Sequence, residues 1–213
     1  MQEEARQVMD ASDIELPEGF TRAQGRNSYQ VGEITGDAFR HDPFNVWLFG
    51  NFRAIRALFH AQARRIYVPR GFSYSMGDEG AAMWMLPGGD STLRFMDYAA
   101  IVLPALFYCG PGALRRAIKT GEAMERQHPD FEHAYLFSIG CRQEHQGKGL
   151  GRKLIQPVLD ACDRNGVIAY LENSNPANEG FYRSCGFEPY GDPIHPEPGS
   201  PALVPMMRQP RRD

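Results

Sequence analysis

Three glycines occur at alternate positions in the stretch Gln146-Gly147-Lys148-Gly149-Leu150-Gly151. Because glycine lacks a Cβ, such a turn lets backbone N–H groups approach a ligand closely. A helix is predicted directly after the turn, and the N–H groups at a helix N-terminus lack intrahelical partners and lie at the positive end of the helix dipole. With Lys148, Arg152 and Lys153 nearby, we expect the turn to bind a phosphate or diphosphate group.

The spacing of these glycines excludes two other phosphate-binding motifs. A Walker loop requires G-x-x-x-x-G-K-[ST], but Gly151 is followed by Arg152. A Rossmann fingerprint requires G-x-G-x-x-G, whereas the spacing here is G-x-G-x-G.

The elements around the turn predict alternating strands and helices. Residues 134–141 (AYLFSIGC) form an almost continuous apolar run, which predicts a buried central strand ahead of the turn. The helix after the turn contains Pro157 and ends at Asn165-Gly166. Further along, we expect strands at 167–172, 187–190 and 202–208, and a short helix at 176–185.

The first half of the chain predicts more helix than strand. Strands are expected at 19–23, 72–76 and 80–86, and helices at 27–40, 52–68, 93–108 and 113–127. His41-Asp42-Pro43 is expected to end the first helix, because proline disfavours helical geometry in the residue before it. Residues 1–18 are expected to form a flexible N-terminal segment, followed by one domain of mixed α/β (α+β) class over residues 19–213.

The second half resembles the GNAT superfamily of N-acetyltransferases. Gln146-x-x-Gly149-x-Gly151 is similar to the Q/R-x-x-G-x-G/A motif of that family, and residues 181–187 (FYRSCGF) match its F-Y-x-x-x-G-F signature. The resemblance covers residues 133–187, including 172–178 (ENSNPAN), and is strongest to the puromycin N-acetyltransferase-like subgroup. It implies a single GNAT domain with a mixed sheet flanked by helices, strands splayed at the cofactor site, and a cofactor-binding half at about residues 130–190.

The resemblance also implies acetyl-coenzyme A (acetyl-CoA) as the cofactor. In the family, the backbone of the strand before the loop binds the pantetheine arm and the acetyl oxygen, which here places Ile139, Gly140 and Cys141 at the site, with Gly140 in a bulge. The pyrophosphate would bind at Gln146, Gly147, Lys148, Gly149, Leu150, Gly151 and Arg152. The family pattern V-x-P before the loop is replaced, since Cys141 and Gln143 stand at its first and third positions.

Two asparagines near the end of the matched region have two interpretations each. Asn175, followed by Pro176, suits a helix cap, since asparagine is favoured at the N-cap and proline at the first helical position. Asn178 is a candidate for a cofactor contact, because the family commonly places an asparagine there, and capping is its alternative role.

Acetyl transfer to an amine sets the requirements for the remaining residues. An ammonium with a pKa of about 10 must lose a proton before it attacks, and the thiolate leaving group benefits from a proton donor. By resemblance, Tyr182 is the general acid that points at the coenzyme A sulfur. Glu172 is one candidate for the general base, and Glu132 and His133 are the others.

The predicted reaction is transfer of the acetyl group to a primary amine, by direct attack through a tetrahedral intermediate. A small-molecule amine, a protein or peptide amine, and a non-catalytic acetyl-CoA-binding role all stay open. The aromatic-rich first half favours a closed pocket and hence a small molecule. Four aromatic residues either line that pocket or belong to the core: Phe44, Trp47, Tyr74 and Trp84.

Composition narrows the class of protein further. With 23 basic and 26 acidic residues the net charge is −3, which argues against a general nucleic-acid binder. The four cysteines contain no C-x-x-C pair, so neither a zinc site nor a disulfide framework is expected. Free thiols suit a reducing cytosol, and the first residues lack the apolar stretch of a signal peptide. We therefore expect a cytoplasmic protein. The oligomeric state stays open, and the resemblance implies a homodimer as one option because many members of the family form dimers.

The most apolar segment is residues 98–109, which contains Pro104. It is shorter than the roughly 20 residues that a membrane-spanning helix needs. We therefore expect a core helix here and no membrane partner.

Overall fold

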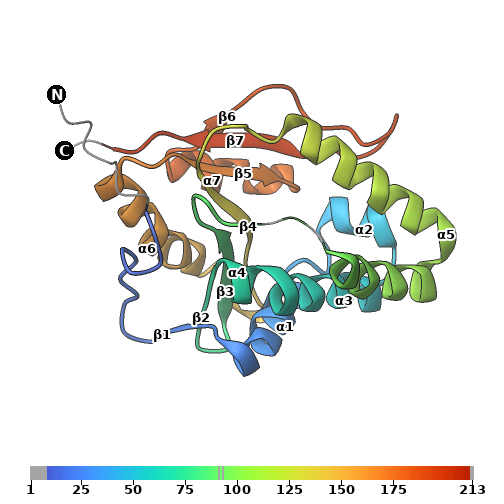
Figure 1. Ribbon diagram of the computed structural model, residues 1–213, viewed down its shortest axis with the longest axis horizontal. Coiled ribbons are helices and arrows are strands. Elements are labelled where there is room, and N and C mark those ends of the chain that lie inside the picture. Colours follow the sequence, from blue (N-terminus) through green and yellow to red (C-terminus); the bar gives the residue numbers. More distant parts are fainter. Residues whose placement is uncertain (1–8, 91, 93, 212–213) are drawn as a thin grey trace.

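The computed structural model describes residues 9–90, 92 and 94–211. Within these residues a seven-stranded sheet with the order β1-β2-β3-β4-β5-β7-β6 forms the centre of the domain (Figure 1). Its strands are β1 (Phe20–Arg22), β2 (Phe72–Met76), β3 (Gly80–Met85), β4 (Ala134–Cys141), β5 (Ala169–Asn173), β6 (Glu188–Pro189) and β7 (Val204–Arg208). All neighbouring pairs are antiparallel except β4 and β5, which are parallel. The predicted mixed sheet is confirmed.

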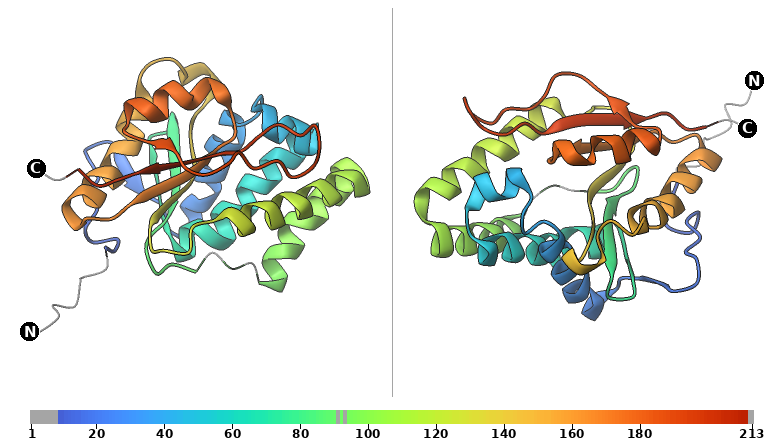
Figure 2. Two further views of the ribbon diagram at one scale, coloured as in Figure 1. Left: turned by 90° about the horizontal axis from the view of Figure 1, so that it is seen from above. Right: turned by 180° about the vertical axis from the view of Figure 1, so that it is seen from behind.

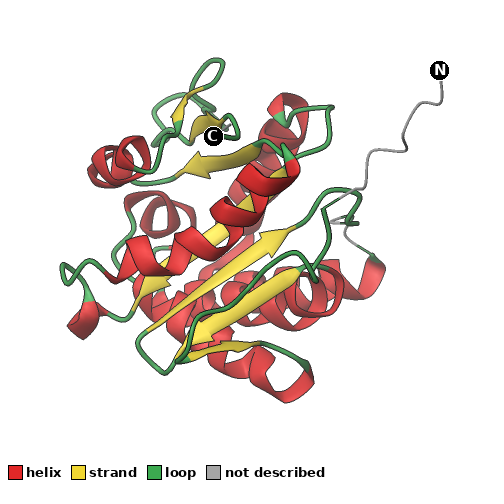
Figure 3. Cartoon of the chain, turned by 90° about the vertical axis from the view of Figure 1, so that its left-hand side faces the viewer, coloured by secondary structure: helices red, strands yellow, loops and turns green. Residues whose placement is uncertain are grey.

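Helices cover both faces of this sheet (Figure 3). One core cluster packs Val31, Ile34 and Phe59 against Met83, and the other packs Leu154 and Val158 against the opposite face. Successive strand residues point to opposite faces, so β3, β4 and β5 each contribute to both cores. The helices of the first face are α1 (Ser28–Ala38), α2 (Pro43–Phe49), α3 (Phe52–Gln62) with its π-helical extension Ala63–Tyr67, α4 (Val68–Arg70) and α5 (Phe95–Gln127); α6 (Leu150–Asn165) covers the second face, and α7 (Glu179–Ser184) follows β5.

The two parallel strands diverge soon after they pair. The register joins only Ala134 to Ala169 and Tyr135 to Tyr170, although β4 continues to Cys141. Beyond Tyr135 the edge of β4 that faces β5 therefore has no strand partner. The expected splay of strands at the cofactor site is confirmed, and it leaves backbone groups of β4 available to a ligand.

The segment around Pro43 differs from the prediction. Helix α1 ends at Ala38, before the proline, and Pro43 begins the additional helix α2 instead of only ending its predecessor. The Asp42 side chain caps α2 by accepting a hydrogen bond from the Asn45 N–H at 2.9 Å. Proline at the first helical position loses no hydrogen bond, because that N–H has no intrahelical partner.

Helix α5 also corrects the sequence prediction. It combines the two predicted helices, which meet at a break in helical geometry at Gly110 (φ 74°). The expected core helix at residues 98–109 is wrong, because Tyr98, Leu103 and Phe107 are exposed by 53%, 63% and 82%. Figures 1 and 2 show α5 at the edge of the molecule, where it contacts α2 and α3 along one side only. By length and composition α5 resembles a membrane-spanning helix, and 17% of its most apolar window is buried in the domain.

The N-terminal segment packs onto the domain over the part that the structure describes. Residues 1–8 of the expected flexible segment lie outside the described residues. Met9 and Ile14 are 1% and 7% exposed and belong to the core cluster that α6 covers. Residues 9–18 are therefore part of the packed domain, and no change from flexible to packed chain occurs at residue 19.

Candidate active site

A groove of about 480 Å³ opens where β4 and β5 diverge and reaches the N-terminus of α6. Its walls come from β4, the glycine loop, the end of α1 and the segment that carries α7. Among its lining residues are most of the predicted cofactor residues: Ile139, Gly140, Cys141, Gln146, Gly147, Gly149, Leu150, Gly151, Arg152, Asn178 and Tyr182. Lys148 is exposed outside this lining, and Glu172 lines a different cavity.

The backbone of the glycine loop is free to bind an anion. In the described part of the chain, no protein group accepts a hydrogen bond from the N–H of residues 147, 148, 149, 150 or 151, whereas the N–H groups of Gln146 and Arg152 bond to carbonyls of the turn itself. Gly147 and Gly149 have φ of 75° and 74°, where an L side chain is strained. These unpaired N–H groups lie at the N-terminus of the 16-residue α6, an arrangement that fits a pyrophosphate.

The third glycine of the loop serves close packing. A Cβ on Gly151 would lie 3.2 Å from the Phe181 ring, so glycine lets α6 approach the segment that carries Tyr182. The next residue, Arg152, donates from Nη2 to the Ser184 carbonyl oxygen at 2.9 Å, which connects α6 to α7. The Arg152 side chain therefore holds α6 against α7, and because Arg152 also lines the groove it would lie near a phosphate bound at the loop.

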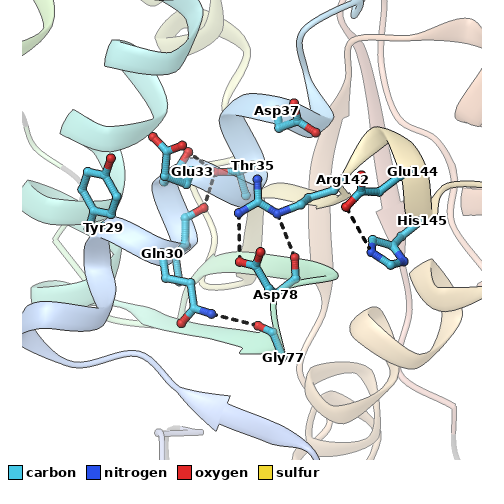
Figure 4. A network of polar contacts seen from close by, with 12 residues as sticks. Tyr29, Gln30, Glu33, Thr35, Asp37, Gly77, Asp78, Arg142, Glu144 and His145 are labelled. Atoms are coloured by element: carbon cyan, nitrogen blue, oxygen red, sulfur yellow. Dashed lines mark hydrogen bonds and ion pairs between the residues drawn. The ribbon is translucent and has the colours of Figure 1, made fainter.

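The turn between β4 and the loop is held without the proline of the family pattern (Figure 4). Gln143 donates from its backbone N–H to the Asp37 carboxylate at 3.1 Å and from its side chain to the Asp37 and Ala38 carbonyls. Arg142 pairs with Asp78 at 2.8 Å, which fixes the turn to the β2–β3 hairpin. A proline at position 143 would lack the N–H that bonds to Asp37. Side-chain bonds thus replace the stiffness of the proline.

The predicted bulge at Gly140 is wrong. Gly140 pairs in regular register with Ala81, and the irregularity lies at the step between Met83 and Trp84, opposite Phe137. Glycine is needed at 140 for a different reason, since a Cβ there would lie 2.4 Å from the Cβ of Ala38. The end of α1 therefore packs directly on β4 beside the groove.

A second cavity of about 220 Å³ adjoins the groove and extends under α5. Phe39, Asn178 and Tyr182 line both spaces, so the cavity and the groove meet at these residues. Its walls are mainly apolar and come from α2, α3, α5, β4 and β5, with Phe44 among them. The other three aromatic candidates do not line it: Trp47 packs on the ring of Phe44, and Tyr74 and Trp84 are fully buried in the core on the far face of the sheet.

Tyr182 lies at the junction of the two spaces. Burial raises the pKa of its hydroxyl above the ordinary value of 10, with a further rise from the Asp42 carboxylate. The hydroxyl stays protonated at neutral pH, and within the described residues it donates to no protein acceptor. It is therefore available as a proton donor to a group at the junction.

Glu172 is the buried carboxyl group of the second cavity. It projects from β5, and its side chain is 2% exposed. His128, at the end of α5, lies with Nδ1 3.4 Å from a Glu172 oxygen. The rival bases Glu132 and His133 line a separate cavity of about 150 Å³ together with His128. Of the three candidates, only Glu172 lines the cavity that meets the groove at Tyr182.

Two polar residues of the groove lining, Asp42 and Asn175, have structural roles. Asn175 accepts from the Ala177 N–H at 3.0 Å and precedes Pro176, so its predicted capping role is confirmed. Ser174 donates to the Asp42 carboxylate at 2.7 Å and thereby links the end of β5 to the start of α2. The Asp42-Pro43 pair carried a recognisable capping signal, whereas nothing in the sequence marks Gln143 or His128 as site residues.

Comparisons with known proteins agree with this geometry. Residues 118–187 match the model of the "Acetyltransferase (GNAT) family". An uncharacterised N-acetyltransferase of Schizosaccharomyces pombe is 27% identical over 183 residues, which cover 78% of this chain and 72% of that protein. The L-amino acid N-acyltransferase MnaT of Escherichia coli is 35% identical over 65 residues, 29% of this chain and 38% of that protein. The N-alpha-acetyltransferase RimI of Mycobacterium tuberculosis is 42% identical over 65 residues, 30% of this chain and 39% of that protein.

A solved structure shares the fold of this chain. A Corynebacterium glutamicum structure described as histone acetyltransferase HPA2 and related acetyltransferase superposes with a TM-score of 0.62 at 20% identity, covering 91% of this chain and 97% of that chain. The chain therefore has the fold of these acetyltransferase structures, and its residues 118–187 are similar to the GNAT family and to relatives named N-acetyltransferases.

Proposed function

We propose that the protein transfers the acetyl group of acetyl-CoA to a primary amine on a small molecule. The observation that carries the proposal is the junction at Tyr182, where the groove with the free loop amides meets the apolar cavity that contains Glu172. Acetyl-CoA supplies an activated thioester. The loop amides at 147–151 and the open edge of β4 would hold its pyrophosphate and pantetheine parts, since both carry unpaired N–H or C=O groups.

Different residues of the chain would carry out the separate steps of the reaction. Glu172 accepts the proton that the acceptor ammonium must lose, and Tyr182 donates a proton to the departing thiolate. Lining residues of both spaces orient the amine toward the thioester. Asn178, which lines both, is placed to contact the cofactor near the transfer point.

Direct attack by the amine fits the groove better than an acetylated cysteine. Cys141 lines the groove, but burial and the Glu79 carboxylate raise the pKa of its thiol to about 11. At neutral pH the thiol is protonated, and the thiolate is the form that acts as a nucleophile.

The acceptor cavity favours a small amine with an apolar body. Its volume of about 220 Å³ lies below the roughly 300–1,000 Å³ of sites for drug-sized ligands. The name of MnaT refers to L-amino acids, whereas that of RimI refers to N-alpha-acetylation, so a protein or peptide amine stays the alternative. A non-catalytic acetyl-CoA-binding protein is less favoured, because Tyr182 stands at the junction.

Three finer predictions accompany this proposal. The loop HQGKGLG at residues 145–151 supports placement in the puromycin N-acetyltransferase-like subgroup. The four free cysteines support a reducing, cytoplasmic location. We also predict that the protein can form a homodimer, which a measurement of its molar mass by light scattering would test.

The test is release of free thiol from acetyl-CoA in the presence of a panel of amines. The panel contains apolar alkylamines and arylalkylamines, amino acids, and short peptides with a free N-terminus. We expect turnover with compact apolar amines and little with peptides. Turnover only with peptides would favour the alternative, and no turnover together with no thermal shift on adding acetyl-CoA would refute the proposal.

A further inference from the structure

A chain of three polar side chains connects the acceptor cavity to a separate cavity on the other side of Tyr135. Glu172 lies on β5, His128 ends α5, and His133 precedes β4. His128 Nδ1 is 3.4 Å from Glu172 Oε1, and His128 Nε2 is 3.2 Å from His133 Nε2. The exposure rises from 2% for the Glu172 side chain to 34% for that of His128.

The hydrogen-bond partners fix which nitrogen of each ring carries a proton. His133 Nδ1 lies 2.7 Å from the Phe131 carbonyl oxygen, which can only accept, so this nitrogen carries a proton. Neutral His133 then accepts at Nε2, and His128 must donate to it from its own Nε2. The lone pair of neutral His128 is therefore at Nδ1, directed at the Glu172 carboxyl group.

This arrangement provides a place for one additional proton between Glu172 and His128. A carboxylate and an imidazole lone pair both accept, so their contact is satisfied only when a proton lies on one of them. Burial, followed by the nearby His128, lowers the pKa of His133, although its bond to Phe131 opposes this. His133 thus stays neutral near pH 7 and keeps accepting from His128.

The tyrosine hydroxyls around these three side chains do not compete for that proton. Tyr67, Tyr135 and Tyr170 face Glu172, and burial followed by the Glu172 charge raises the pKa of each hydroxyl, so all three stay protonated. Glu132 lines the 150 Å³ cavity beside both histidines, and Tyr190 packs against Tyr170 and Phe131. Tyr135 lines both cavities and separates them.

We propose that His128, held in its Nε2–H form by His133, receives at Nδ1 the proton that Glu172 takes from the acceptor ammonium. The nitrogen–hydrogen bond of the ammonium breaks and an O–H bond forms on Glu172; that O–H then breaks as an N–H forms on His128. Water in the 150 Å³ cavity removes the proton from the resulting imidazolium, which returns both groups to their starting state. This inference rests on the proposed N-acetyltransferase function. It assigns Glu172 as a catalytic residue and the two histidines as positioning residues that act through it.

The test compares His128→Asn with the wild-type enzyme on an alkylamine whose ammonium pKa is near 10. Asparagine keeps an acceptor for Glu172 but carries no titrating proton. We expect kcat at pH 7 to fall on the order of 10²-fold, the lower end of general acid–base contributions, with an unchanged KM for acetyl-CoA. The loss should shrink as the pH approaches the ammonium pKa, and it should be small for an arylamine that is already neutral at pH 7.

Two further variants separate proton transfer from packing. His128→Ala leaves space beside Glu172, so added imidazole should restore part of kcat. His133→Asn should lower kcat less, by about 10-fold, because His128 stays in place. His195→Asn is the control, since His195 lies in the C-terminal loop with Nδ1 3.2 Å from the Ser200 carbonyl and lines none of these cavities. Thermal unfolding of each variant reports any loss of structure.

The possible outcomes are distinct. The relay is refuted if His128→Asn keeps the wild-type kcat. It is also refuted if the loss of kcat is equal at every pH and for both amines and imidazole does not restore it. Either result leaves the acetyltransferase proposal intact. If the wild-type protein releases no thiol with any amine, the proposed function itself fails.

Discussion

Replacement of Gly149 by alanine tests whether the loop holds the pyrophosphate through its backbone. Gly149 has φ 74°, and a Cβ added there would meet no atom within 4 Å, so the substitution adds conformational strain without a clash. An L residue in this region costs about 1–2 kcal/mol. Because none of the N–H groups at 147–151 bonds to another of the described residues, the loop can relax in the free state, and the strain returns only when the ligand binds. We therefore expect the Kd for coenzyme A to rise about 5- to 30-fold, with little change in the free energy of unfolding.

Gly191→Ala is the matched control. Gly191 has φ 72° and equally open surroundings, but it lies outside both cavities. Hydrogen bonds from Tyr190 to Pro205 and between Ile194 and Leu203 hold its loop in place. Its strain should therefore appear in folding, as a loss of about 1–2 kcal/mol in urea unfolding, with an unchanged Kd by titration calorimetry. If Gly149→Ala binds coenzyme A like the wild type and loses the same unfolding free energy as Gly191→Ala, the backbone cradle is refuted.

Three further substitutions test the other parts of the site and the fold. Tyr182→Phe should lower kcat by about 10²-fold or more while coenzyme A binds as before; unchanged steady-state turnover would exclude Tyr182 as the acid. Gly121 lies on the α5 wall of the acceptor cavity, so Gly121→Leu should lower kcat/KM for the bulkiest amines in the panel without changing the Kd for coenzyme A. Equal losses of kcat/KM for all amines would contradict the assignment of this cavity to the amine. Asp163→Asn should cost about 2–3 kcal/mol in urea unfolding, less than a fully buried pair, because Asp163 is 22% exposed beside the buried Arg208. Burial raises the pKa of Asp163, but hydrogen bonds from Arg208 and the Arg211 N–H lower it overall. The stability from this pair is therefore present above about pH 4 and is lost as the pH falls through the lowered pKa. An Asp163→Asn variant whose acid unfolding curve matches that of the wild type would contradict this prediction.

The cofactor half could be predicted from sequence because its signals are local. The apolar run of β4, the glycines of the loop and the amphipathic α6 each specify their structure within one short segment. Strand β4 spans the predicted residues 134–141. The function of Gly140 was harder to predict, because its close contact with Ala38 joins residues about 100 positions apart.

The errors in the first half have a common physical cause. Residues 98–109 are apolar enough for a core, but a helix is buried only if another element covers it. Helix α5 contacts α2 and α3 along one side, and Leu103 and Phe107 face outward. Composition states how apolar a segment is, whereas burial depends on how the chain arranges the other elements around it.

The two halves of the site differ in what recognises the ligand. The proposed pyrophosphate site consists of backbone N–H groups at a helix N-terminus, which almost any sequence with glycines at the right positions can present. The acceptor cavity is built from side chains of α2, α3, α5, β4 and β5, so its shape depends on residues that no short motif contains. Substitutions in those walls can therefore change the amine without changing the cofactor. Glu172 would be the exception among the wall residues, because the proposed proton relay through His128 needs a carboxyl group at that position whatever the amine.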